Sequence, residues 1–267
     1  MQSPTLFESR RVAPETYTLP AYLPVPGAGI LPVNAFLIHA AQPLLVDTGL
    51  AALKSDFMKR LSQLIDLEDL AWIWLTHTDP DHLGNLTDVL AAAPNARIVT
   101  TFLGMGKLGL QQIPTDRVYL LNPGQKLDLG DRTVTAIKPP SFDAPETTGL
   151  FDSKTRTLFS ADCFGALMHQ PAQTALEITP DALHEGLVAW SMVDAPWLAM
   201  VDAHAFDRAL NTVHQLNAEM VLSSHLPPAP GMVDALLTHL RATRFATPAN
   251  GPDQQAFEQI MAQIMVA

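Results

Sequence analysis

The sequence has very little cysteine, because Cys163 is the only one among its 267 residues. A single thiol excludes an intrachain disulfide and a zinc site built from several thiolates. Long apolar runs are also missing, and no stretch reaches the ~18 consecutive apolar residues that a membrane-spanning helix needs. The N-terminal segment, Met1–Tyr17, is polar and charged and lacks the apolar centre of a signal peptide. We therefore expect a cytoplasmic protein with no membrane partner.

Positive charge is scarce as well. The chain carries 16 Lys and Arg against 27 Asp and Glu, for a formal net charge of −11. Proteins that bind nucleic acid through its phosphates usually carry an excess of positive charge, so we expect no nucleic-acid partner. Internal repeats and low-complexity blocks are absent, and the hydrophobic fraction of 48% is typical of a folded globular chain.

Short apolar and β-branched runs predict strands. They lie at Ala35–His39, Leu44–Val46, Ala71–Leu75, Arg97–Thr101, Val118–Leu121, Val134–Ile137, Leu158–Ser160 and Met220–Leu222. Helical spacing occurs between them, as where Leu53, Phe57 and Leu61 share one face. Prolines such as Pro20 and Pro24 are interpreted as marking loops. Strands dominate the first half and helices the second, which predicts two packed sheets with helices outside.

The last part of the chain differs in character. We predict one domain over residues 1–245, a linker over residues 246–253 that is rich in Pro and Gly, and an amphipathic helix over residues 254–267. This helix either docks on its own domain or forms a contact in a homodimer.

A glycine-rich segment, Gly104–Gly109, matches the pattern G-x-G-x-x-G after a predicted strand. A lone match is weak evidence for nucleotide binding, and Pro114 would cut short a following helix. We therefore interpret the segment as a connector. Cys163 is expected to be a small buried residue. Histidines outside the motifs below are expected to be ordinary, although His169 has the best claim to line a substrate pocket.

Potential metal ligands are concentrated between a predicted strand and a predicted helix. Four of them fall within six residues: His77, Asp79, Asp81 and His82. Imidazole nitrogen and carboxylate oxygen are ligands that iron, manganese and zinc accept. The alternative is an acidic helix cap with incidental histidines, since Asp favours helix starts.

Three other predicted strands also end in a polar side chain, which favours the metal interpretation. Asp47 follows one strand, Asp162 follows a second and His225 follows a third. A rigid scaffold presents a site in this way, with one ligand where each strand stops.

These segments, in this order, resemble the metallo-β-lactamase superfamily from about Asn34 to about His225. The resemblance implies a mixed α/β (α+β) fold, a four-layer αββα sandwich with a dinuclear metal site at one edge of the sheets. The common superfamily pattern is H-x-H-x-D-H, whereas Asp79 makes this sequence H-x-D-x-D-H. A carboxylate at that position is typical of flavodiiron proteins and the related oxygen-binding diiron proteins. The loop Pro139–Thr147 resembles the flavodiiron loop His-Trp-Pro-Asp-Ser, with Asp143 at the place of the His.

The resemblance implies a complete ligand set. The first metal would be held by His77, Asp79 and Asp143. The second would be held by Asp81, His82 and His225. Asp162 would bridge the two ions, and Asp81 and Asp162 are also the candidate catalytic residues. Asp47 would orient a ligand or tie down the motif loop.

The function expected first is that of a diiron protein that is redox-active or binds oxygen. Oxygen-rich ligation favours iron, with zinc or manganese as alternatives. A flavodiiron protein carries a flavodoxin domain after this core, but too few residues follow His225 for one. We therefore expect no bound flavin and an external electron donor, with dioxygen or another small molecule as substrate.

Two other functions remain open. A zinc or mixed-metal hydrolase would use a metal-bound hydroxide on lactone, thioester or phosphoester substrates. A binding protein with a vestigial site is the third hypothesis, although both replacements, Asp79 and Asp143, still offer metal ligands.

Overall fold

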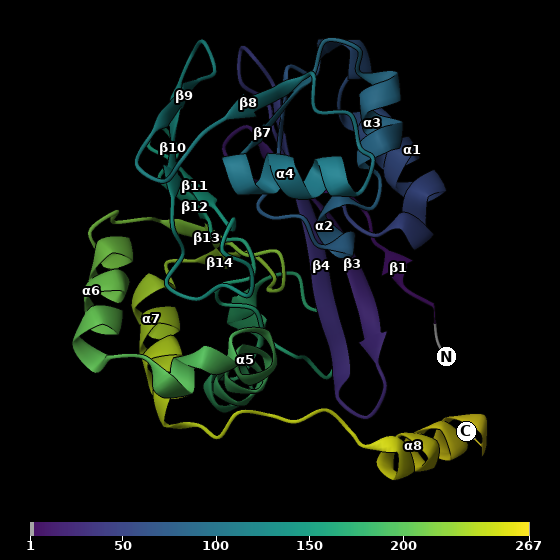
Figure 1. The fold of residues 1–267 in the computed structure, drawn as a ribbon, viewed down its shortest axis with the longest axis vertical. Coiled ribbons are helices and arrows are strands. Elements are labelled where there is room, and N and C mark those ends of the chain that lie inside the picture. The colour runs from purple at the N-terminus through teal and green to yellow at the C-terminus, as the bar shows by residue number, and fades with distance from the viewer. Residues whose placement is uncertain (1–2, 267) are drawn as a thin grey trace.

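Two β-sheets packed face to face form the centre of the computed structural model, which describes residues 3–266 and the side chains of residues 3–262 (Figure 1). The first sheet has the order β1-β3-β4-β5-β6-β7-β8, with β2 beside β3. Its strands are β1 (Thr5–Leu6), β2 (Arg10–Ala13), β3 (Thr16–Val25), β4 (Gly29–Ile38), β5 (Leu44–Val46), β6 (Trp72–Trp74), β7 (Arg97–Thr100) and β8 (Val118–Leu120). From β5 to β8 neighbouring strands run parallel.

The second sheet has the order β14-β13-β12-β11-β10-β9. Its strands are β9 (Lys126–Asp128), β10 (Thr133–Ile137), β11 (Gly149–Asp152), β12 (Thr157–Phe159), β13 (Met220–Leu222) and β14 (Ala229–Pro230). The pair β12–β13 is parallel, so both strands end at the same edge of the sheet.

Apolar side chains fill the space between the sheets and cover both outer faces. Phe36 and Trp74 of the first sheet pack in one buried cluster with Leu150, Phe159 and Leu222 of the second. The helices are α1 (Lys54–Leu64), α2 (Pro80–Leu83), α3 (Leu86–Ala92), α4 (Phe102–Leu110), α5 (Pro180–Asp194), α6 (Ala203–His214), α7 (Val233–Ala242) and α8 (Gln254–Val266). Helices α1 and α3 cover the first sheet, and α5, α6 and α7 cover the second. These layers confirm the predicted αββα sandwich.

Two local predictions were wrong. Gly104–Gly109 is not a connector, because it lies within helix α4, where the Thr101 hydroxyl caps the first turn by accepting from Gly104 N. A Cβ at Gly104 would stand 2.2 Å from Thr100 Oγ1, so the close approach of helix and strand requires glycine here. Pro20 and Pro24 do not mark loops but lie in β3, where each pairs with a residue of β4. Proline is tolerated in a strand where its missing N–H is not needed by the ladder.

The C-terminal helix α8 lies apart from the helices that cover the second sheet (Figure 1). The segment before it, residues 246–253, contains neither helix nor strand. The helix reaches the β3–β4 turn, where Ile260 Cδ1 would be 3.2 Å from a Cβ placed on Gly27. This contact favours docking on its own domain, while a homodimer contact stays a prediction. Within residues 3–266, no helix is long and apolar enough to span a bilayer.

Candidate metal centre

Four loops that follow strand ends carry the candidate ligands to one edge of the sandwich. The loop after β6 and the helix α2 supply His77, Asp79, Asp81 and His82. Asp79 precedes the first turn of α2, and Pro80 opens the helix with its fixed φ. Asp143 lies after β10, Asp162 after β12 and His225 after β13. The structure thus brings together all seven residues predicted as ligands.

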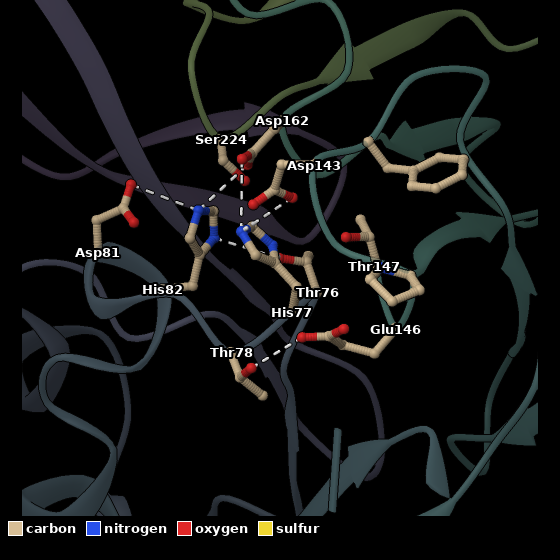
Figure 2. A network of polar contacts seen from close by, with 12 residues as sticks. Thr76, His77, Thr78, Asp81, His82, Asp143, Glu146, Thr147, Asp162 and Ser224 are labelled. Carbon is tan, nitrogen blue, oxygen red and sulfur yellow. Dashed lines mark hydrogen bonds and ion pairs between the residues drawn. The ribbon is translucent and has the colours of Figure 1, made fainter. Parts of the chain in front are cut away.

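Their donor atoms form two groups that share one carboxylate. Ligand atoms of His77, Asp79 and Asp143 lie within 4.8 Å of one another, and so do those of Asp81, His82 and His225. These are the two predicted ligand sets. Figure 2 shows Asp81, Asp143 and Asp162 converging on the imidazoles of His77 and His82.

Asp162 faces the two groups with different oxygen atoms. Its Oδ2 is 3.5 Å from Nε2 of His77, while its Oδ1 is 3.1 Å from Nε2 of His82 and 3.2 Å from Nε2 of His225. Ligands about 2.0–2.2 Å from one ion lie at such mutual distances. The geometry is therefore that of a carboxylate able to bridge two ions.

Several of these donor atoms are buried and lack a hydrogen-bond partner within the described residues: His77 Nε2, His82 Nε2 and Asp162 Oδ1. Leaving a buried polar atom unsatisfied is costly, so such atoms in a native structure require an explanation. A pair of cations between the two groups would satisfy all three atoms. The residues present therefore fit a dinuclear metal site.

Hydrogen bonds on the far side of each ring orient the three imidazoles. Nδ1 of His225 donates to the carbonyl oxygen of Pro32 at 2.7 Å, and Nδ1 of His82 lies 2.9 Å from Asp47 Oδ2. The Thr76 hydroxyl donates to Asp47, which leaves its oxygen free to accept from His77 Nδ1 at 3.2 Å. Each ring thus carries its proton on Nδ1 and presents Nε2 to the site.

Asp47 anchors this arrangement from the Asp-Thr-Gly turn after β5. Its carboxylate accepts hydrogen bonds from Thr76 N and Thr76 Oγ1, both at 2.8 Å. The same carboxylate also lies beside His82. The backbone of Asp47 has a φ of 58°, a left-handed conformation that Asp and Asn tolerate better than most residues. The turn packs so closely on α2 that a Cβ at Gly84 would stand 2.4 Å from Gly49 O.

Residues 31–225 match the model of the family described as ODP family beta lactamase. The chain belongs to the ODP beta-lactamase family. This finding confirms the resemblance inferred from the motifs. The match covers the first sheet from β4 onward, the second sheet up to β13, and all seven candidate ligands.

Relatives of this ODP family chain include flavoproteins. A protein of Thermosynechococcus vestitus that carries the name diflavin flavoprotein A 1 is 37% identical over 135 residues, which are 50% of this chain and 24% of that protein. The anaerobic nitric oxide reductase flavorubredoxin of Salmonella typhi is 28% identical over 134 residues, 49% of this chain and 28% of that protein. The chain therefore spans about a quarter of the length of these relatives.

Solved structures agree on the fold. The rubredoxin oxygen:oxidoreductase of Desulfovibrio gigas superposes with a TM-score of 0.77 at 18% identity, over 89% of this chain and 61% of that chain. A flavo di-iron protein mutant of Thermotoga maritima gives the same TM-score of 0.77 at 18% identity, over 91% and 62%. At this identity the likeness shows the fold, which is the metallo-β-lactamase sandwich predicted from the sequence.

The imidazoles and carboxylates of the ODP family site strongly shift one another's protonation. Burial disfavours a charged His225, but Asp162 and Asp81 outweigh it and raise the pKa of His225 to about 9. Burial likewise opposes protonation of His82, while Asp81, Asp162 and Asp47 together raise its pKa. The histidines in turn hold the pKa of Asp162 well below its usual range, against the effect of burial. Cations bound between these groups would replace the protons on the imidazoles.

The loop that carries Asp143 is fixed at three points. Lys138 Nζ donates to the carbonyl oxygens of Pro145 and Thr147, and Trp197 Nε1 donates to Phe142 O at 2.8 Å. The carboxylate of Glu146 accepts from Thr78 Oγ1 and from Lys107 Nζ, which ties this loop to the His77 loop and to α4. Asp143 Oδ1 lies 3.9 Å from His77 Nε2, and its side chain is 25% exposed.

Helix α5 contributes two residues that the sequence did not reveal. The ring of Trp190 packs on His225 with centroids 4.6 Å apart, and its Nε1 donates to Asp162 O. A Cβ at Gly165 would lie 2.5 Å from that nitrogen, so this contact requires glycine. Asp194 ends the helix, with a carboxylate oxygen within 4.8 Å of Asp143 and Asp162. Neither stands in a recognisable sequence motif.

Cys163 is buried, as expected, whereas a substrate pocket at His169 stays a prediction. His169 lines a cavity of about 210 Å³ formed by residues 166–172 and the start of α5, apart from the candidate ligands. The Cys163 thiol is buried, and burial raises its pKa to about 12, which keeps it protonated at neutral pH.

Proposed function

We propose that this chain holds two metal ions and reacts with a small oxidant such as dioxygen or nitric oxide. Iron is the metal that we favour. The observation that carries the proposal is the pair of donor groups joined by Asp162, whose two oxygens face different imidazoles. The names of the similar proteins support it, because one is a rubredoxin oxygen:oxidoreductase and another a nitric oxide reductase.

In this proposal each ion has its own ligands. His77, Asp79 and Asp143 would hold one ion, and Asp81, His82 and His225 would hold the other, with Asp162 between them. When bound, the metal pair would bind the small oxidant and pass electrons to it. The chain would hold the ligands in register through Asp47 and Thr76, and Trp190 would keep water from the outer face of His225.

The chemistry of the donors favours iron or manganese over zinc. The set contains four carboxylates and three imidazoles, so hard oxygen donors outnumber nitrogen donors. Anionic ligands also lower the Lewis acidity of a bound ion, which disfavours a hydrolase that depends on a metal-bound hydroxide. Asp81 and Asp162 remain the candidate catalytic residues. Asp162 faces both donor groups, and Asp81 Oδ2 lies 3.4 Å from His82 Nε2 within one of them.

The source of electrons is a separate part of the proposal. The αββα core and α8 account for residues 3–266, and no flavodoxin-like sheet is found among them. An external electron donor and the absence of bound flavin stay parts of the proposal. The partners of the longer relatives do not transfer to this chain, because it matches only about a quarter of their length.

Metal analysis of the protein, purified without added metal, tests the proposal. We expect about two metal ions per chain, mostly iron, and oxygen uptake after anaerobic chemical reduction. The Asp162→Asn variant, purified in parallel, should retain much less metal because it lacks the shared carboxylate. Two zinc ions without iron, together with turnover of a lactone or thioester, would contradict the redox function and support a hydrolase.

A further inference from the structure

Asp194 is a carboxylate at the candidate metal centre to which no role has been assigned. It is the last residue of α5, and its carboxylate lies within 4.8 Å of ligand atoms of Asp143 and Asp162. The three carboxylates come from three different elements, so their meeting is a product of the tertiary fold. Burial and, after it, the neighbouring Asp162 and Asp143 raise the pKa of Asp194 to about 8, against a smaller lowering effect of His225 and His82.

The surroundings of Asp194 disfavour a negative charge. Helix C-termini carry a partial negative charge, so a carboxylate at the end of α5 is electrostatically unfavourable. Within the described residues, Asp194 takes part in neither an ion pair nor a side-chain hydrogen bond, and only burial and nearby charges act on its pKa. A partly buried carboxyl beside two others either keeps its proton or, when ionised, is compensated by a cation.

An independent observation points to such a cation. The imidazole of His77 is fully buried, and its Nε2 has no hydrogen-bond partner among the residues that the structure describes. That atom is directed at the same carboxylates, 3.5 Å from Asp162 Oδ2 and 3.9 Å from Asp143 Oδ1 (Figure 2). An imidazole lone pair facing a group of carboxylates is the arrangement that a metal ion completes.

We propose that Asp194 is an eighth ligand of the centre and binds the same cation as Asp143 and Asp162. The inference rests on the proposed dinuclear site, because it extends the first of its two donor groups. It also places a further donor atom beside Asp143, at the position where the related loop carries an imidazole. With Asp194, hard oxygen donors dominate that half of the site, which favours iron or manganese over zinc.

The test compares Asp194→Asn with wild type, using Mn²⁺ alone as the probe. Apoprotein is prepared with a chelator, and free Mn²⁺ is followed by electron paramagnetic resonance during titration. Wild type should fill about two sites, and Asp194→Asn should bind one of them about tenfold or more weakly. The matched control is Glu185→Gln, which removes the same charge from an exposed position on the same helix and should bind Mn²⁺ like wild type.

Thermal unfolding of the apoproteins separates a ligand from a structural residue. Asp194→Asn keeps the shape of the side chain, and the raised pKa leaves Asp194 mostly uncharged in the apoprotein at neutral pH, so the apoprotein of the variant should be at least as stable as wild type. An apoprotein less stable than wild type would assign Asp194 a structural role and overturn the inference. Unchanged Mn²⁺ affinity in Asp194→Asn would overturn it as well, while leaving the proposed dinuclear centre intact. If wild type itself binds fewer than two ions, the proposed function fails, and the inference fails with it.

Discussion

Asp47 and His82 are joined by a hydrogen bond of 2.9 Å between Oδ2 and Nδ1, and this bond turns Nε2 of His82 toward Asp162. The same carboxylate accepts two hydrogen bonds from Thr76, whose hydroxyl also lies 3.2 Å from His77 Nδ1. One buried acid thus sets the orientation of imidazoles in both donor groups. Its place behind the ligands agrees with the supporting role predicted for it.

Asp162→Ala should lose more bound metal than Asp47→Ala, because the first variant removes a shared ligand and the second only its support. Replacing a residue that supports the ligands without binding metal usually weakens metal binding by about 10–100-fold. The metal sites of Asp47→Ala should therefore still fill at high metal concentration. Metal content after dialysis against a range of metal concentrations measures the difference. Asp47→Asn is the control for backbone strain, since Asn tolerates the left-handed φ of 58°. Equal losses in the two Ala variants would contradict a bridging Asp162.

Asp143→His should keep or raise the affinity of the first metal position. Asp143 Oδ1 lies 3.9 Å from His77 Nε2 on a partly exposed loop, so an imidazole can replace the carboxylate without entering the core. The change restores the residue that the related loops carry at this place. Isothermal titration with Fe²⁺ under nitrogen gives the affinity, and the ultraviolet spectrum of the iron-loaded protein reports the change of ligand. An unchanged affinity and spectrum would indicate that residue 143 does not bind metal.

Lys107→Met should destabilise the fold, because it leaves Glu146 as a buried carboxylate held only by Thr78. The Glu146 side chain is fully buried, whereas Lys107 is about one-third exposed. An uncompensated buried polar group costs about 1–3 kcal/mol, which urea unfolding of the apoprotein resolves. The double variant Lys107→Met/Glu146→Met should regain part of the loss, since it also removes the buried charge. If Lys107→Met is as stable as wild type, the ion pair does not stabilise the loop.

The sequence predicted those parts of the site that depend on strand ends. Asp47, Asp162 and His225 each follow a buried apolar run, and such runs mark where parallel strands deliver a side chain to the edge of a sheet. Asp194 could not be predicted in this way. It lies at the end of a helix whose apolar pattern indicates only packing, and its proximity to Asp162 arises from how α5 crosses the second sheet.

Local composition misled the prediction where tertiary contacts override it. The prolines of β3 suggested loops, but long antiparallel pairing with β4 holds them in a strand. The glycines of α4 suggested a connector, although the Thr101 cap and close packing on Thr100 stabilise a helix there. In both segments, contacts with another part of the structure determine the conformation, and the pattern of neighbouring residues in the sequence does not reveal these contacts.

His184 on α5 and His239 on α7 should make the stability of the protein depend on pH. Their Nδ1 atoms are 3.2 Å apart, so one ring donates and the other accepts, and the pair holds together only while one ring is neutral. Burial, and then the charge of His184, lower the pKa of His239 below its ordinary value of 6.5. The unfolded chain therefore binds the proton more readily than the folded one. The contribution to stability is complete above pH 6.5 and is lost as the pH falls from there toward the lowered pKa.

The pH dependence can be isolated by comparing wild type with His239→Gln, since the other titrating groups are common to both. We expect wild type to be more stable by about 0.5–1 kcal/mol at pH 7.5, the usual net contribution of one hydrogen bond. This difference should shrink at pH 5.5, because the lowered pKa of His239 makes the unfolded chain take up the proton more readily than the folded one. Urea unfolding of the two apoproteins at each pH gives the four free energies of unfolding. A difference that is equal at both pH values would show that the pair does not titrate as a unit.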